Sequence, residues 1–136
     1  MSDGQVVERS DAGDPQYSTK AAISREMVRL YKEQFGRGPT RARTEFAGPD
    51  VLVATLEDSF TPAERRLVEM GQVDRLRDMR TYFQHATEGD FCTSVEALLG
   101  RSVRGFTSGI DVAHDISTEV FYLEPGPDVA EAPPRP

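Results

Sequence analysis

The sequence predicts an α+β fold made of two similar halves, each a helix followed by a β-hairpin. One helical segment ends at Gly36-Arg37 and another at Gly100-Arg101, and two strand-like segments follow each of them. In both halves the second of these segments ends in Leu-Glu. The order α-β-β-α-α-β-β then gives a four-stranded antiparallel sheet with the helices packed on one face, because amphipathic helices and strands bury their apolar sides against one another in layers.

Length and composition are those of one soluble domain. The chain has 136 residues, of which 38% are hydrophobic and 29% charged, and this length is typical of a single core. The formal net charge is −7. Such a balance disfavours a general nucleic-acid-binding protein, because neutralisation of phosphates supplies most of the affinity of that class. We therefore expect no nucleic-acid partner.

The sequence favours a cytoplasmic location. Its single cysteine, Cys92, cannot form an intramolecular disulfide, which fits a reducing compartment. The N-terminal segment is polar and acidic and lacks the apolar run of a signal peptide. The chain also lacks the roughly eighteen consecutive apolar residues that a membrane-spanning helix needs. We expect no insertion into a membrane, although a peripheral position stays compatible with the sequence.

Three parts are predicted along the chain. Residues 1–18 are acidic, contain glycine and proline and show no periodicity, so a disordered N-terminal tail is expected. Residues 19–124 contain every periodic segment and form the single domain. Residues 125–136 are rich in proline and are expected to be a second disordered tail.

The first helix is predicted from about Thr19 to Phe35. Gly36 and Gly38 end it, because glycine readily adopts the left-handed conformation that follows helix C-termini, and Pro39 prevents continuation. The apolar residues that recur at the spacing of one buried helical face are Ile23, Met27, Leu30, Tyr31 and Phe35.

Two hairpins are predicted from their strand patterns. The first joins strands over Arg41–Ala47 and Val51–Leu56 through the turn residues Gly48-Pro49-Asp50. Its second strand is apolar on both faces, as expected of an interior strand. The second hairpin joins strands over Ser102–Ser108 and Ile116–Leu123, the latter with one face more polar than the other.

Two helices are predicted between the hairpins. Thr61-Pro62-Ala63-Glu64 is typical of a helix start, since threonine caps the helix, proline occupies its first turn and glutamate reaches back to the cap. That short helix should run to about Met70. A longer one follows over Val73–Leu99, and Gly89-Asp90 should weaken or kink it midway.

The segments that carry a family resemblance are Ile23-Ser24 to Phe35, Gly36-Arg37-Gly38-Pro39-Thr40, Thr61-Pro62-Ala63-Glu64, Gly100-Arg101 and Val120-Phe121-Tyr122-Leu123-Glu124. In these features the chain resembles a bacterial domain family that is named after MpsC, the small soluble component of a sodium-translocating, membrane-potential-generating system. The resemblance covers about residues 19–124. Gly89-Asp90 departs from the charged, helix-favouring residues expected in that family.

The resemblance implies a soluble partner of membrane transport machinery that is linked to sodium or inorganic carbon. It carries no catalytic residue, cofactor or metal ligand over to this chain. Shared fold does not by itself establish a shared role.

The most distinctive candidate site is the basic stretch around the first glycine turn. Residues 20–46 carry seven basic and three acidic side chains, although the whole chain is acidic. Guanidinium groups bind carboxylate, bicarbonate or phosphate through two parallel contacts. An anion or an acidic protein partner is therefore expected at Gly36, Arg37, Gly38, Arg41 and Arg43. The alternative is a solvated edge strand whose arginines guard against aggregation.

Two further clusters have simpler structural explanations. His85 and Glu88 lie one helical turn apart and could share a metal ion, but such pairs are common by chance. Cys92 would need an activating neighbour to serve as a nucleophile. The turn residues Asp111, His114 and Asp115 could hold a hard cation, but turns favour aspartate for backbone reasons alone. We expect no metal site, no cofactor and no catalytic residue.

Two functions remain open from the sequence. The first is a non-catalytic accessory or binding protein, with a protein partner and a homodimeric state as expectations. The second is a small-anion-binding regulator, or a small enzyme, with its site at the Gly36–Arg43 turn.

Overall fold

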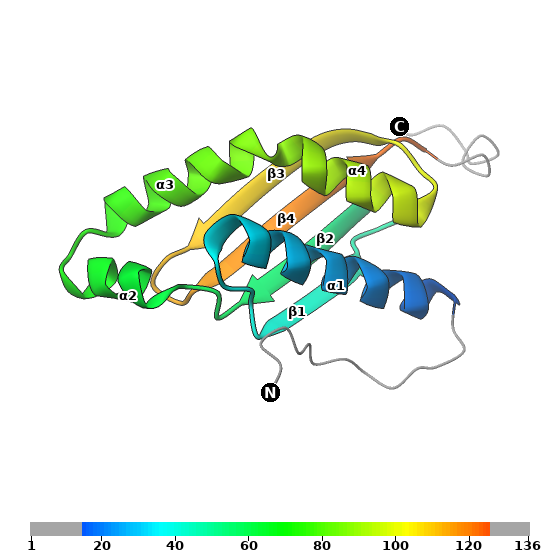
Figure 1. Cartoon of the computed structure of the whole chain (residues 1–136). Helices are drawn as coiled ribbons and strands as arrows, with labels where there is room; N and C mark the ends of the chain where they lie inside the picture. Colours follow the sequence, from blue (N-terminus) through cyan, green and yellow to red (C-terminus); the bar gives the residue numbers. More distant parts are fainter. Residues whose placement is uncertain (1–14, 126–136) are drawn as a thin grey trace.

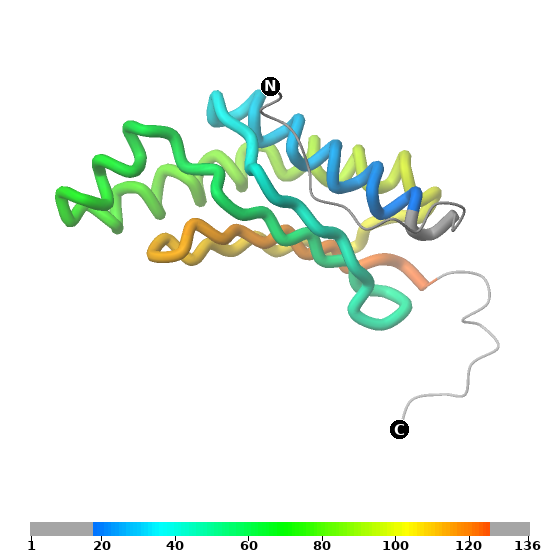
Figure 2. The backbone as a smooth tube through the Cα atoms, turned by 90° about the horizontal axis from the view of Figure 1, so that it is seen from below, coloured from blue at the N-terminus to red at the C-terminus, as the bar shows by residue number. Residues whose placement is uncertain are grey.

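The computed structural model describes residues 15–125, with side chains from residue 18 onward. It contains a four-stranded antiparallel sheet and four helices (Figure 1), which confirms the predicted α+β class. Helices α1, α3 and α4 cover one face of the sheet and α2 lies at one end of it, while no described helix covers the opposite face (Figure 2). The elements are α1 (Pro15–Phe35), β1 (Arg41–Phe46), β2 (Val51–Glu57), α2 (Pro62–Glu69), α3 (Val73–Ala86), α4 (Glu88–Leu99), β3 (Val103–Asp111) and β4 (Ile116–Leu123).

The sheet has the order β1-β2-β4-β3, so the second strand of each hairpin is central. Strand β2 pairs with β4 in register Val53↔Val120, and β1 and β3 form the two edges. This arrangement confirms that two helix-plus-hairpin halves build one sheet. It also confirms that β2 is an interior strand, as its apolar pattern predicts.

Helix α1 begins at Pro15, a few residues earlier than predicted. Residues 15–18, which the sequence pattern assigned to the N-terminal tail, therefore form its first turn. Proline is well tolerated there, because the first backbone N–H groups of a helix have no partner inside the helix. Residues 1–14 and 126–136, where the predicted tails fall, lie outside the described residues.

The main core lies between the sheet and helices α1 and α4. The buried strand residues come from alternate positions, as in Leu52, Ala54 and Leu56 of β2, since successive side chains of a strand point to opposite faces. The remaining members of this cluster are Ile23, Met27, Val28, Leu30, Tyr31, Ala42, Phe91, Val95, Phe121 and Leu123.

The predicted long helix over Val73–Leu99 is in fact two helices. The break lies at Thr87, whose φ of −112° and ψ of 14° leave the helical region, and not at Gly89-Asp90, which lie inside α4. The Thr87 hydroxyl donates to the carbonyl of Phe83 at 2.8 Å and accepts from Gln34 Nε2 of α1 at 2.7 Å. Local hydroxyl contacts of this kind compete with the helical ladder, so a threonine with a tertiary partner ends α3.

A satellite core at the far end of the sheet joins α2 and α3 to the β3–β4 turn. It contains Phe60, Leu76 and Val112. The predicted capping box of α2 is present, because Thr61 Oγ1 accepts from the Glu64 N–H at 3.2 Å and Glu64 Oε1 accepts from the Thr61 N–H at 2.9 Å. The same glutamate has a second role.

Arg80 of α3 is fully buried between the two cores. Its Nη2 and Nε atoms donate to both carboxylate oxygens of Glu64 at 2.6 and 2.7 Å, and two further donations reach the hydroxyl and the carbonyl of Ser59. The guanidinium carbon lies 3.8 Å from the centre of the Phe35 ring. Burial alone would raise the pKa of Glu64, but the hydrogen bonds from Arg80 and Thr61 outweigh it and lower the pKa below its ordinary value.

We predict that Arg80→Met lowers the free energy of unfolding by about 3–5 kcal/mol, since removal of one partner leaves the other charge buried without compensation. Combining it with Glu64→Gln should recover part of this loss. Urea denaturation measures both effects. Arg77→Met on the exposed side of the same helix is the control and should change stability by less than about 1 kcal/mol. If Arg80→Met were as stable as the wild type, the contacts of Arg80 with Glu64 and Ser59 would not stabilise the fold.

Candidate functional site

The two glycines of the predicted site have conformational roles. Gly36 ends α1 with φ of 85°, and its N–H donates to the Lys32 carbonyl at 2.9 Å. Side chains rarely adopt this left-handed backbone, which glycine reaches without strain. A Cβ atom at Gly38 would lie 3.0 Å from the carbonyl oxygen of Val28. Glycine at position 38 therefore lets the turn pack directly against the helix that it leaves.

Arg37 holds the turn against the end of β2. Its Nη1 donates to the carbonyl of Asp58 at 2.5 Å and to that of Phe60 at 3.3 Å, and its Nη2 lies 3.3 Å from the Asp58 carboxylate. Arg101 occupies the same position in the second half of the fold. It donates to the carbonyl of Glu124, the residue that follows β4, at 2.9 Å. The repeated Gly-Arg pair therefore ties each helix end to the end of its inner strand.

Asp58 collects the contacts around this turn. Its carboxylate accepts from Thr40 Oγ1 at 2.8 Å and from Arg65 Nη2 at 3.0 Å, besides its ion pair with Arg37. Its φ is 61°, a region that aspartate tolerates better than most side chains. Burial raises the pKa of Asp58, but the contacts with Thr40, Arg37 and Arg65 outweigh it, and the pKa lies below its ordinary value.

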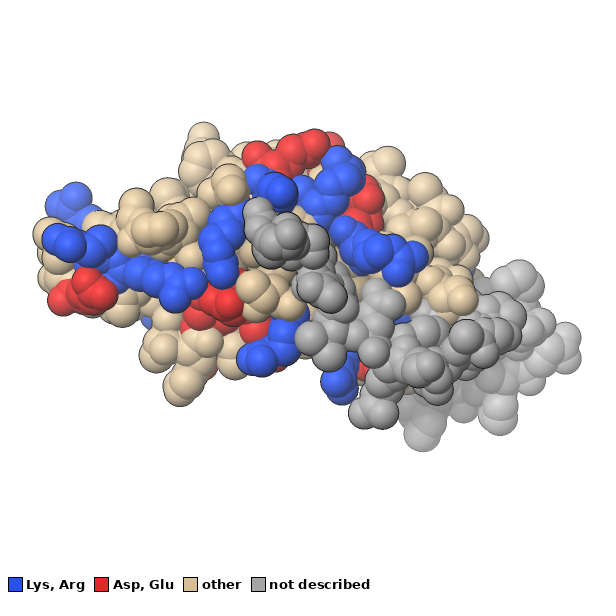
Figure 3. Space-filling model, turned by 60° about the horizontal axis from the view of Figure 1, so that its bottom comes forward, with Lys and Arg blue, Asp and Glu red and all other residues tan. Residues whose placement is uncertain are grey.

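Arg41 and Arg43 lie on the exposed face of β1, away from the helices. Arg41 Nη2 pairs with Glu57 Oε1 of the neighbouring strand at 3.1 Å. Arg43 is exposed, and none of the described residues forms an ion pair with it. Basic side chains form a band across this side of the molecule, with acidic groups between them (Figure 3).

The structure thus brings Gly36, Arg37 and Gly38 together in one turn but gives the three guanidinium groups different surroundings. Arg37 donates to backbone carbonyls and Arg41 is paired, whereas Arg43 has no ion-pair partner among residues 15–125. A hollow of about 370 Å³ opens beside the turn, lined by Phe35, Gly36, Arg37, Gly38, Thr40, Thr61 and Pro62. Binding of an anion or acidic partner at the predicted residues stays a prediction.

A second polar cluster, which the sequence patterns do not predict, lies inside the core. Glu119 of β4 is fully buried and its Oε2 accepts from the Tyr31 hydroxyl at 2.5 Å and from Gln84 Nε2 at 3.2 Å. Burial raises the pKa of Glu119 to about 7, although the side chains of Tyr31, Ser108 and Gln84 oppose that rise. This carboxyl group therefore changes its protonation near neutral pH.

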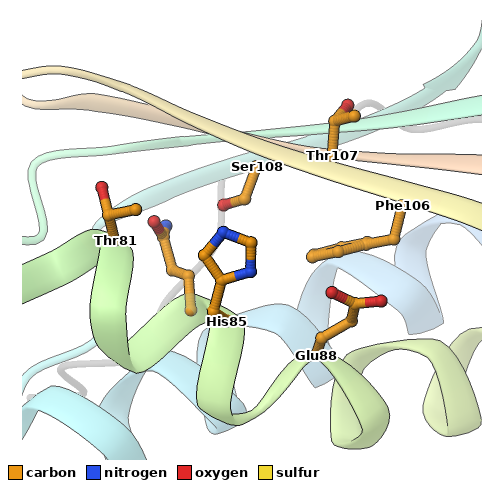
Figure 4. Close-up of a pocket in the computed structure, with 7 residues that line it drawn as sticks. Thr81, His85, Glu88, Phe106, Thr107 and Ser108 are labelled. Carbon is orange, nitrogen blue, oxygen red and sulfur yellow. The ribbon is translucent and has the colours of Figure 1, made fainter.

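A cavity of about 180 Å³ leads toward this cluster between α3 and the edge strand β3. His85 and Ser108 point toward each other across it, while Thr107 points to the other side of the strand (Figure 4). His85 and Glu88, whose spacing in the sequence is compatible with a shared metal ion, both line this cavity. Its lining is Thr81, Gln84, His85, Glu88, Phe106, Thr107 and Ser108.

Cys92 and Asp115 are also candidates for reactive or cation-binding residues, and their contacts explain them structurally. Burial, together with Glu88, Glu96 and Glu119, raises the pKa of the Cys92 thiol to about 11, so the thiol stays protonated and is a poor nucleophile. Asp115 caps the loop after β2 by accepting from the N–H groups of Ser59 and Phe60, each at 3.0 Å.

Asp111 and His114 form an exposed pair with 2.9 Å between Oδ2 and Nδ1. Within residues 15–125, three or more histidine, cysteine or carboxylate side chains do not gather as they would around a metal ion.

Comparison with known proteins places the chain in a described family. The family model described as "Na+-translocating membrane potential-generating system (MpsC)" matches residues 16–125. Neither the curated proteins nor the solved structures provide a match.

We predict that Asp58→Asn destabilises the protein at neutral pH and that the difference disappears in acid. A carboxyl group with a lowered pKa stabilises the fold at pH values above its unfolded pKa, and this stabilisation is lost as the pH falls through the folded value. Asparagine tolerates the same positive φ. Urea midpoints of both proteins between about pH 7 and about pH 2 measure the effect.

Asp78→Asn, at an exposed position on α3, is the control, and its urea midpoint should follow that of the wild type at each pH. A difference between wild type and Asp58→Asn that stays constant into acid would show that the charge of Asp58 is not its basis.

Proposed function

The chain belongs to the MpsC family, and we propose that it is a non-catalytic accessory protein of the Na+-translocating, membrane-potential-generating system for which that family is described. It would act by binding another protein of that system. The family match carries this proposal, because it spans nearly all of the described residues.

The exposed face of β1 is the surface that we propose for this partner. Arg43 has no ion-pair partner among residues 15–125, and Arg41 is held only by one exposed pair with Glu57. Exposed ion pairs of this kind contribute little to stability, so a partner carboxylate can replace Glu57 at low cost. Guanidinium groups on an edge strand would recognise an acidic surface and also speed its encounter.

We propose a cytoplasmic location, with attachment to the membrane only through the partner. None of the helices that the structure describes is long and apolar enough to cross a bilayer. The basic band in Figure 3 supports contact with an acidic protein surface.

A second candidate is a regulator that binds a small oxyanion such as bicarbonate at the Gly36–Arg43 turn, or a small enzyme acting there. The hollow of about 370 Å³ beside Gly36 and Arg37 favours it. Against it, the Arg37 guanidinium already holds two backbone carbonyls and a carboxylate. The turn also follows a helix C-terminus, whose dipole repels anions. We therefore prefer the protein partner.

We predict that Arg41→Ala combined with Arg43→Ala weakens capture of the other components of the system from solubilised native membranes, while the free energy of unfolding changes by less than about 1 kcal/mol. Capture by wild type should fall as salt rises from about 50 to about 300 mM, because screening acts on these charges. Mass spectrometry of the captured proteins measures the effect.

The control is Arg66→Ala with Arg75→Ala, which removes the same charge from exposed positions on α2 and α3. Equal capture by both double mutants would show that the β1 face is not the binding surface. Binding of bicarbonate by wild type, lost in Arg41→Ala/Arg43→Ala, would favour the second candidate.

A homodimer is also proposed, on the basis of apolar side chains that stay exposed on α3 and α4. Tyr82, Phe83 and Leu98 are 70%, 38% and 41% exposed. Aromatic and other large apolar side chains are common in the interfaces of symmetric dimers. Light scattering at micromolar concentration should give about twice the chain mass of 15.1 kDa. A mass near 15.1 kDa would exclude the dimer at that concentration.

A further inference from the structure

Two buried oxygen atoms on the same face of β4 have no hydrogen-bond partner within the described chain. They are Oε1 of Glu119 and Oγ of Ser117, and both residues are fully buried. Proteins pair nearly all buried polar atoms, because an unpaired one loses its hydration without replacement. Residues two apart on a strand share a face at about 7 Å. We take two unpaired buried oxygens on one face of a strand as the sign of a bound group between them.

The chemistry around these atoms suits a small cation with one positive charge. The polar side chains that meet there are the Glu119 carboxylate, the hydroxyls of Tyr31 and Ser117, and the Gln84 amide, which donates to Tyr31 Oη at 3.1 Å. Oxygen donors are the ligands that hard cations prefer. A single carboxylate balances one positive charge, whereas a divalent ion would stay partly uncompensated in this buried setting.

A cavity open to solvent ends at two neighbours of the cluster. The cavity between α3 and β3 is lined by Gln84, which contacts Glu119, and by Ser108, which pairs with Glu119 in the β3–β4 ladder. Its lining includes the carboxylate of Glu88, which lies beside Phe106 (Figure 4). The lining contains no lysine or arginine, so the entrance favours cations over anions.

We propose that Glu119, Ser117 and Tyr31 bind a dehydrated alkali cation, Na+, which enters through the cavity between α3 and β3. The cation site follows from the contacts of these residues. The choice of Na+ rests on the proposed function, because the family description names that ion.

Such a cation would connect three parts of the fold. Tyr31 belongs to α1, Gln84 to α3 and Glu119 to β4, so an ion among them would hold both helices to the centre of the sheet. The stability of the helical layer would then depend on the Na+ concentration. This would let the protein report the state of the ion that its system moves.

The test compares thermal unfolding of the full-length chain in NaCl, KCl and choline chloride at one ionic strength, at about pH 8, where Glu119 with its pKa of about 7 is ionised. A ligand that binds only the folded state raises the melting temperature, by about 5 °C when its concentration is ten times the dissociation constant. We expect such a rise in NaCl relative to choline chloride. Broadening of the ²³Na resonance by the wild-type protein measures binding directly and needs no variant.

Two variants locate the ion. Glu119→Gln keeps the side-chain volume but removes the charge, and it should abolish the rise in melting temperature and the ²³Na broadening. Ser117→Ala removes one oxygen and should weaken Na+ binding by about tenfold, as loss of a single contact does. Glu69→Gln, an exposed change on α2, is the matched control and should respond to Na+ as wild type does.

Identical melting curves in the three salts, together with an unbroadened ²³Na resonance, would overturn the proposal. A Na+ response that Glu119→Gln retains would also overturn it, since the ion would then bind elsewhere. An equal response to KCl would keep the alkali-cation site and overturn the assignment to Na+. These outcomes are independent of partner capture, so the failure of one proposal can be told from the failure of the other.

Discussion

The buried guanidinium of Arg80 joins parts of the fold that apolar packing alone leaves separate. The main core under α1 and α4 and the satellite core at α2 are distinct clusters. Between them Arg80 contacts Glu64 of α2, Ser59 of the preceding loop and the Phe35 ring at the end of α1. A charge in such a place is tolerated only when its donors are satisfied, and this requirement fixes where α2 and α3 lie relative to α1.

The likeness of the two halves has a physical basis in their Gly-Arg pairs. Gly36 and Gly100 both take up positive φ after a helix, and the arginine after each donates to the carbonyl that follows an inner strand. The same short motif therefore joins a helix end to the centre of the sheet in each half of the fold. Between the halves, α2 and α3 break the symmetry, and α3 lines the cavity beside β3.

Local sequence signals predicted most of the fold, and tertiary contacts decided the remainder. The capping box of α2, the glycine after α1 and the alternation in the strands are properties of a few neighbouring residues, so they could be recognised. The helix break at Thr87 depends on Gln34 of α1, and no local pattern reports such a partner.

For the candidate sites too, local sequence patterns predict some residues, and tertiary contacts determine the roles of the others. The basic neighbourhood of Arg37 predicts a binding residue, and only the structure shows that its guanidinium donates to the carbonyl of Asp58. Arginine and glutamate are usually exposed to solvent, whereas Arg80 and Glu119 are fully buried. The more polar face of β4, noted from the sequence, was the one available signal for Glu119.

The strand order carries a consequence for how the chain reaches its native state. The pairs β1–β2 and β3–β4 join neighbouring segments, whereas the central pair β2–β4 joins segments separated by three helices. Closing so long a loop loses much chain entropy before any contact compensates for it, and folding slows as such distant pairings increase. The two hairpins can form early and locally. We therefore expect their docking along β2 and β4 to be the step that sets the folding rate.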